Sequence, residues 1–142
     1  MPEAFYSTAE EVETAFYQAM QSANLEAMMS LWAEDEEIVC VHPTGVRLVG
    51  HVQIRESWRQ IFSGDQRLQV ALSRLAKHED ALVSVRSVYE HICVQGEQHL
   101  PAPVVCTNVF IHTPGGWRMV AHHASPSGAQ AATMHEGPAV IH

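Results

Sequence analysis

The spacing of the hydrophobic residues changes once along this chain, close to Arg67, and that change limits the folds that the sequence can adopt. Before Arg67, apolar residues recur every three or four positions, which is the period of a helix with one buried face. After Arg67 they alternate with polar residues, which is the period of a strand. A block of helices followed by a block of strands predicts an α+β domain.

Three helices are predicted in the first block, and each has a recognisable start. Thr8 and Glu11 form a capping box before the first helix, Asn24 can cap the second, and Gly50 precedes the third. The residues expected on the buried faces of these helices are Val12, Phe16, Ala19, Met20, Ala23, Leu25, Met28, Met29, Trp32, Ile54, Trp58, Ile61 and Phe62.

The second block predicts consecutive strands joined by short turns, and such strands must run antiparallel. An alternating run begins at Leu68, and longer strands are expected over residues 81–94, 104–113 and 117–126. A hairpin of two short strands, 38–41 and 46–49, precedes the third helix. The expected fold is a set of three N-terminal helices packed on a strongly curved antiparallel sheet.

Charge and cysteine content narrow the class of protein. The formal net charge of −8 argues against binding to nucleic acids or to anionic membranes, because both need a basic surface. The chain shows no signal peptide and no apolar run near the ~20 residues of a membrane-spanning helix. Cys40, Cys93 and Cys106 lack C-x-x-C spacing and are expected to be buried thiols in a reducing compartment. These features predict a cytoplasmic protein.

The last predicted strand has an unusual composition. Strict alternation puts Trp117, His123 and Ser125 on one face, which runs from large and apolar to small and polar. Such a gradient suits the wall of a pocket. We therefore expect His123 to face a cavity and the adjacent His122 to face outward, at an interface between subunits.

Several short segments of this chain form a pattern known from one superfamily. They are residues 31–35 (LWAED), 41–45 (VHPTG), 107–110 (TNVF) and 116–123 (GWRMVAHH), with Gly50, Ile54 and Trp58. Over residues 7–126 the chain thus resembles the SnoaL-like members of the nuclear-transport-factor-two-like (NTF2-like) superfamily. The resemblance implies a cone-shaped fold that hosts isomerases, cyclases, dehydratases, binding proteins and association domains. It implies a domain over 1–126, and we expect the tail, 127–142, to pack on that domain or on a partner subunit.

The resemblance also suggests catalytic positions. In similar isomerases, a carboxylate that ends a strand before a proline is the base, and the matching residue here is His42. Their oxyanion hole uses a helix tyrosine and a strand carboxylic acid, which match Phe16, next to Tyr17, and Asn108; Phe16 cannot donate a hydrogen bond and Asn108 can. We predict His42, His123 and Asn108 as a cluster that grips a carbonyl and moves a proton. Each also fits a structural role: a loop histidine, a packed strand histidine and a cross-strand amide.

Further residues are predicted to line the pocket. They are Trp32, Trp58, Glu90, Tyr17, Trp117 and Ser125. The two helix tryptophans fit a plain core role as well. Glu90 would share a strand face with Arg86, opposite Tyr89 and His91, and a surface salt bridge is the alternative role for its carboxylate.

A metal site is a further hypothesis. His42, His123 and Glu90 could supply two imidazoles and a carboxylate, a set that suits non-haem iron or zinc. The sequence contains no H-x-H or H-E-x-x-H spacing and no nucleotide-binding fingerprint, so we predict neither a metal nor a cofactor.

Two functions remain open at this level. The first is a protein whose pocket in the cone binds a small apolar carbonyl compound, with acid–base isomerase, cyclase or dehydratase chemistry. The second is a non-catalytic homodimerisation or association module with a vestigial cavity. In both cases we expect a homodimer through the outer face of the sheet, because that face would otherwise expose an apolar patch. The residues expected in the patch are Val105, Val109, Ile111, Val120 and Ala124.

Overall fold

The computed structural model describes residues 4–96 and 103–127, and in this part of the chain the predicted helices and strands are present. The helices are α1 (Ala9–Ser22), α2 (Leu25–Ser30) and α3 (His51–Phe62). The strands are β1 (Val39–Val41), β2 (Arg47–Val49), β3 (Leu68–Glu79), β4 (Val83–Val94), β5 (Val104–Thr113) and β6 (Gly116–Pro126). The α+β prediction is confirmed.

One sheet contains all these strands, in the order β2-β1-β6-β5-β4-β3. The hairpins β3–β4, β4–β5 and β5–β6 are antiparallel, as predicted. The short strand β1 is different, because it pairs in parallel with β6. The prediction of a purely antiparallel sheet is therefore wrong at this one ladder. Strands β1 and β6 are far apart in the sequence, so no hairpin fixes their relative direction.

The capping residues start the first two helices as the sequence predicts, except that the Glu11 carboxylate reaches the backbone of Ser7 and not that of Thr8. The Thr8 side chain accepts a hydrogen bond of 3.1 Å from the Glu11 backbone N–H, and the Glu11 carboxylate accepts one of 2.7 Å from the Ser7 backbone. Asn24 caps α2 in the same way, by accepting from the Ala27 backbone N–H at 3.0 Å. These caps satisfy orphan N–H groups and fix where each helix starts.

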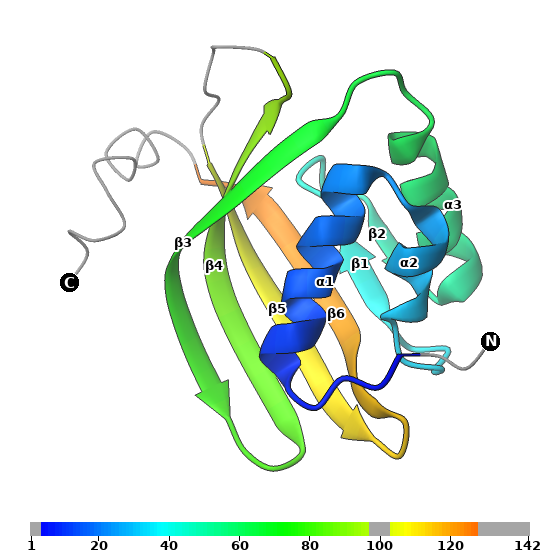
Figure 1. Cartoon of the computed structure of the whole chain (residues 1–142), viewed down its shortest axis with the longest axis vertical. Coiled ribbons are helices and arrows are strands. Elements are labelled where there is room, and N and C mark those ends of the chain that lie inside the picture. The colour runs from blue at the N-terminus through cyan, green and yellow to red at the C-terminus, as the bar shows by residue number, and fades with distance from the viewer. Residues whose placement is uncertain (1–3, 97–102, 128–142) are drawn as a thin grey trace.

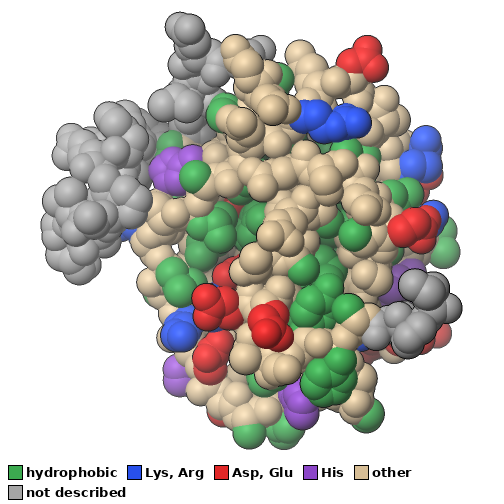
Figure 2. All heavy atoms as spheres, viewed as in Figure 1, with side chains coloured by type: hydrophobic (Ala, Val, Ile, Leu, Met, Phe, Trp, Pro, Cys, Tyr) green, Lys and Arg blue, Asp and Glu red, His purple; other side chains and the backbone are tan. Residues whose placement is uncertain are grey.

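Helix α1 lies across the concave inner face of the sheet, while α2 and α3 lie beside it over β1 and β2 (Figure 1). In Figure 2, hydrophobic side chains are visible on both sides of α1, and acidic side chains gather near its N-terminal end, where the helix dipole favours them. The main core lies between the helices and the inner face of the sheet. Its largest fully buried members include Trp32, Phe16, Phe110, Met28 and Ile54.

A β-bulge in β6 determines which of its side chains face inward. Val109 of β5 pairs with Ala121, but the next residue, Phe110, pairs with Met119, so Val120 is an extra residue in β6. Strict alternation is broken there. As a result Met119 and His122 both face inward and are buried, and His123 is exposed on the outer face.

Other expectations concern the termini and the cysteines. The packing predicted for residues 127–142 falls, beyond Ser127, outside the described residues. All three cysteines are free; Cys40 and Cys106 are buried as expected, and Cys93 is only half-buried. None of the helices within residues 4–96 and 103–127 is long and apolar enough to cross a membrane.

Candidate functional site

A row of polar side chains crosses the inner face of the sheet beneath α1. Arg86 of β4 lies opposite Asn108 of β5, Asn108 lies opposite His122 of β6, and His122 lies opposite Cys40 of β1. Residues that are paired across neighbouring strands point to the same face, so the row is a direct product of strand register. Every member of this row is at most 3% exposed.

One end of the row is charged and paired. The Nε of Arg86 donates to a Glu13 carboxylate oxygen at 2.8 Å, and its Nη1 donates to Glu79 at 3.0 Å. Glu13, on α1, is only 4% exposed, and its second oxygen accepts from the Asn108 amide at 3.0 Å. Buried charges must be paired and hydrogen-bonded to be tolerated, and this group meets both conditions.

The middle of the site is a chain of hydrogen bonds that ends on a second buried carboxyl group. The Asn108 amide also donates to the Tyr17 hydroxyl at 3.0 Å, and that hydroxyl donates to Glu90 at 2.5 Å. Glu90 is 1% exposed. Burial raises the pKa of Glu90, against the lowering effect of the Tyr17 hydrogen bond. Burial likewise raises the pKa of Tyr17, which stays protonated as the donor.

The same network fixes the tautomer of His122. Because the Asn108 nitrogen donates to Glu13 and Tyr17, the Asn108 oxygen faces His122, 2.7 Å from Nδ1. An amide oxygen only accepts, so Nδ1 carries the proton and Nε2 carries the lone pair. Burial lowers the pKa of His122 to about 3, so the ring is neutral near pH 7.

Cys106 lies in the same cluster but is not arranged as a nucleophile. Its thiol donates to the Asn108 oxygen at 3.2 Å and contacts His122 Nδ1 at 3.3 Å. In a Cys–His–Asn triad the cysteine and the asparagine use opposite nitrogens of the histidine ring, whereas here they share Nδ1. Burial also raises the pKa of Cys106, which disfavours the thiolate. The arrangement therefore does not support covalent catalysis.

Aromatic rings form the wall beside His122. The Trp58 ring lies edge-on to the rings of Phe16 and His42, with ring centroids 5.7 Å and 5.0 Å apart. The centroid of the His122 ring is 6.2 Å from that of Trp58. The His42 ring also contacts the Ser57 hydroxyl, and burial lowers its pKa. The indole nitrogens of Trp32 and Trp58 are buried without a hydrogen-bond partner in the described part of the chain. An unsatisfied buried donor is unusual in a folded protein, so both N–H groups are free to donate to a further acceptor.

The structure brings some of the predicted site residues together. Asn108, Glu90 and Tyr17 are in direct hydrogen-bond contact, and Trp58 lies in the adjoining aromatic wall. His42 follows β1 on the inner side of the sheet and reaches this wall through Trp58. The hydroxyl that meets Asn108 belongs to Tyr17, the residue next to Phe16, which the resemblance matched to the isomerase tyrosine. Whether any of these residues is catalytic stays a prediction.

Other predicted positions are wrong. His123 lies on the exposed outer face and His122 is buried at the site, the reverse of the expected orientations, because of the extra residue Val120. A cluster of His42, His123 and Asn108, and a metal site of His42, His123 and Glu90, are therefore excluded. Ser125 pairs with Val105, away from the inner face.

The two remaining tryptophans lie away from the cluster. The Trp117 ring is tilted against the His112 ring, with ring centroids 5.3 Å apart. Trp117 also borders a surface cleft beside the start of α1. Trp32 is a core residue, 2% exposed, next to Met119.

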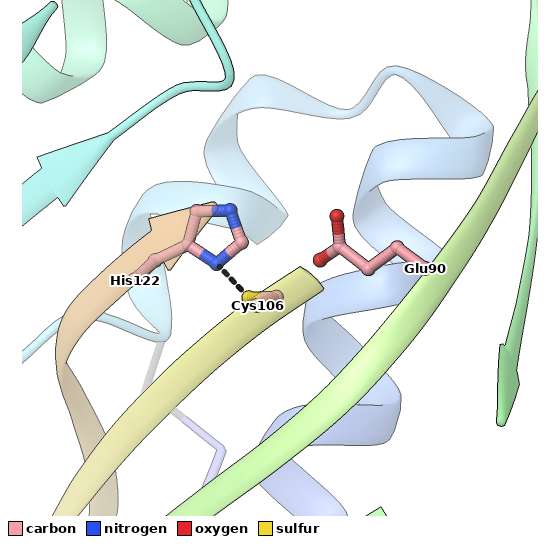
Figure 3. A group of neighbouring side chains, drawn as sticks. All are labelled: Glu90, Cys106 and His122. Carbon is pink, nitrogen blue, oxygen red and sulfur yellow. Dashed lines mark hydrogen bonds between the residues drawn. The ribbon is translucent and has the colours of Figure 1, made fainter. Parts of the chain in front are cut away.

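Four site residues were not predicted from the sequence as members of this site: Glu13, Arg86, Cys106 and His122. The spacing of Glu13 and Tyr17, four residues apart beside the apolar stripe of α1, is the signal that places both on one helix face. Two of these four, Cys106 and His122, form a group with the predicted residue Glu90, and the ligand atoms of the three all lie within 4.8 Å of one another (Figure 3).

Comparison with known proteins gives the family. A model of the SnoaL-like domain family matches residues 9–129. A curated relative, the F-box protein SKIP8 of Arabidopsis thaliana, is 26% identical over 124 residues, which are 85% of this chain and 52% of the relative. The chain thus spans about half the length of that relative.

Solved structures agree with this match. One, from Thiobacillus denitrificans, is named a "putative calcium/calmodulin-dependent protein kinase type II association domain". Its sequence is 35% identical to this one, and the two structures superpose with a TM-score of 0.78 over 87% of this chain and 98% of that chain. Another, from Streptomyces avermitilis, is named a "putative dehydratase from the NTF2-like family"; it is 32% identical, with a TM-score of 0.75 over 84% of this chain and 94% of that chain. On this evidence, and on the fold described above, the chain belongs to the SnoaL-like domain family of the NTF2-like superfamily.

Proposed function

We propose that this domain binds a small organic carbonyl compound between α1 and the inner face of the sheet and transfers a proton on it. The observation that carries the proposal is the environment of Glu90, a carboxyl group that is 1% exposed. Within the described residues its hydrogen-bond partners are the neutral Tyr17 hydroxyl and the neutral Cys106 thiol, and none of the salt bridges includes it. A purely structural acid in this position would be costly, and buried acids with raised pKa values are frequent at catalytic sites.

The chemistry follows from the protonation states. Because the pKa of Glu90 is raised, Glu90 is a stronger base than an ordinary carboxylate, whereas His122, with a pKa of about 3, is a weak base. Glu90 would take a proton from the carbon beside the carbonyl, and the C–H electron pair would form an enolate. The unsatisfied N–H of Trp58 would donate to the enolate oxygen.

The same step serves two reaction types. If Glu90 returns the proton to a different carbon of the enolate, the reaction is an isomerisation. If Glu90 gives the proton to a β-hydroxyl group, which then leaves as water, the reaction is a dehydration. The Streptomyces avermitilis relative, whose name is "putative dehydratase from the NTF2-like family", supports the second. The free cysteines support a reducing compartment, and we propose a cytoplasmic location.

Proton exchange tests the proposal directly. Cyclohexanone is incubated with the protein in D2O, and loss of the hydrogens beside its carbonyl is followed by proton NMR. We expect the wild type to accelerate exchange, Glu90→Gln to abolish the acceleration, and the exposed control His123→Ala to retain it. Equal acceleration by wild type and by a folded Glu90→Gln variant would exclude Glu90 as the base.

A second function is favoured by a different observation. The outer face of β4 exposes Val83 and Val85, each more than a third exposed, and half-buried Val105, Val109 and Ile111 extend this face over β5. Ala124, expected in this patch, is instead buried on the inner face opposite Cys106. The apolar outer face and the relative named as an association domain support a homodimer or association module.

A further inference from the structure

Glu90, Cys106 and His122 come from three neighbouring strands, β4, β5 and β6, and point toward one another beneath α1 (Figure 3). Their ligand atoms all lie within 4.8 Å of one another, and the Cys106 sulfur is 3.3 Å from His122 Nδ1. Two ligands on a tetrahedral zinc ion are about 3.3–3.8 Å apart, given bond lengths near 2.0–2.3 Å. The Cys106–His122 pair is therefore already at metal-ligand separation, and the Glu90 carboxylate, within 4.8 Å of both, would have to move closer on binding.

We infer that Glu90, Cys106 and His122 form a binding site for a zinc-type divalent cation. A thiolate, an imidazole and a carboxylate together favour zinc over magnesium or calcium, which prefer oxygen ligands alone. Three protein ligands leave a fourth position open for a water or for a ligand oxygen. The inference stands on ligand geometry alone and does not depend on the proton transfer proposed above.

One neighbouring side chain is placed to support such a site. Tyr17 donates to Glu90 at 2.5 Å, and a donor of this kind orients a ligating carboxylate. Asn108, whose oxygen holds His122 Nδ1, would have to release that nitrogen to the metal. All three ligands are at most 2% exposed, so water competes weakly for them.

Metal binding would displace protons from the cluster. Binding through Nδ1 would replace the proton that His122 shares with Asn108, and the Cys106 thiol would have to ionise. A metal binds the deprotonated thiolate, carboxylate and imidazole, so binding should release protons and strengthen as the pH rises.

Cobalt(II) is the probe that reports the thiolate. Protein stripped with EDTA is titrated with Co²⁺ at pH 7.5 and pH 6, while the near-ultraviolet thiolate-to-cobalt charge-transfer band is recorded. We expect the band to saturate at one equivalent of Co²⁺. The apparent affinity for Co²⁺ should be at least ten-fold lower at pH 6 than at pH 7.5. Zn²⁺ should displace the cobalt and remove the band.

Matched variants assign the ligands. Cys106→Ser should abolish the band and His122→Ala should remove or shift it, whereas Cys93→Ser and His123→Ala, which change residues outside the cluster, should leave it unchanged. Histidines elsewhere can bind cobalt but produce no thiolate band. A folded wild-type protein that gives no thiolate band, or a band that survives Cys106→Ser, would overturn the inference.

Failure of this inference and failure of the proposed function are separable. Ketone exchange that depends on Glu90 in the EDTA-treated protein, without a cobalt band, would reject the metal site alone. A cobalt band without ketone exchange would support the metal site and reject the proton transfer.

Discussion

Asn108 lies directly opposite His122 in the β5–β6 ladder, and its side-chain oxygen is 2.7 Å from His122 Nδ1. This pair joins the two halves of the buried network. Through its nitrogen, Asn108 reaches the charged half at Glu13 and the Tyr17–Glu90 half, and through its oxygen it holds the neutral imidazole. Changes to the network should therefore appear in both the stability of the domain and its pH dependence.

Replacement of Glu90 by Gln should change how stability varies with pH. The folded-state pKa of Glu90 is raised, so above the ordinary glutamate pKa the unfolded chain releases a proton that the folded protein retains. Wild-type stability should then fall as the pH rises toward the folded pKa, with a slope of up to about 1.4 kcal/mol per pH unit. Glu90→Gln should lack this slope in urea unfolding measured from pH 4 to pH 8. Parallel curves for the two proteins would contradict the prediction.

His122 should control the acid side of the stability profile. The unfolded histidine takes up a proton below about pH 6.5, whereas the folded ring stays neutral until its pKa of about 3. Stability should be lost as the pH falls through this window, by up to about 1.4 kcal/mol per pH unit. His122→Gln should flatten that loss, and His123→Gln, on the exposed neighbour, should keep the wild-type profile.

Removing one partner of the buried ion pair should be far more damaging than removing both. Arg86→Met leaves the Glu13 carboxylate buried without its cation and should cost about 3–5 kcal/mol. Adding Glu13→Gln should recover a large part of that loss. Urea unfolding of the single and double variants measures the coupling, and Arg59→Met, which breaks an exposed pair with Glu56, should have little effect.

Gly116 should tolerate no side chain. Its φ is +102°, and an added Cβ would lie 2.9 Å from the backbone N and O of Tyr6, which receives a hydrogen bond from Trp117. Gly116→Ala should cost at least about 1 kcal/mol from the backbone conformation alone. Gly64→Ala, where nothing lies within 4 Å, is the control and should leave the thermal midpoint nearly unchanged.

The outer face should respond to charge if it forms the proposed homodimer. Val85→Glu places a carboxylate in the apolar patch and should convert dimer to monomer in sedimentation velocity at micromolar concentration. Val52→Glu, on α3 and 84% exposed, is the control. A wild-type protein that sediments as a monomer would contradict the dimer itself.

Much of the fold could be predicted from local patterns. Thr8 and Asn24 cap their helices as expected, because a cap depends on residues within one turn. Arg86 and Glu90 share one face of β4 as predicted, because that strand keeps its alternation, although the sequence did not show that this is the inner face. These features depend on neighbours in the sequence, so the sequence alone determines them.

The candidate site depended on contacts that no local pattern specifies. The sequence could show Glu13 and Tyr17 one helical turn apart, but only the packing of α1 on the sheet brings them to Arg86 and Asn108. The parallel pairing of β1 with β6 joins segments about eighty residues apart. The bulge at Val120 shifts the alternation by one residue, and hydrophobicity gives no sign of it, because Val120 and Ala121 are both apolar. That one extra residue, accommodated by pairing with β5, decided that His122 rather than His123 lies in the site.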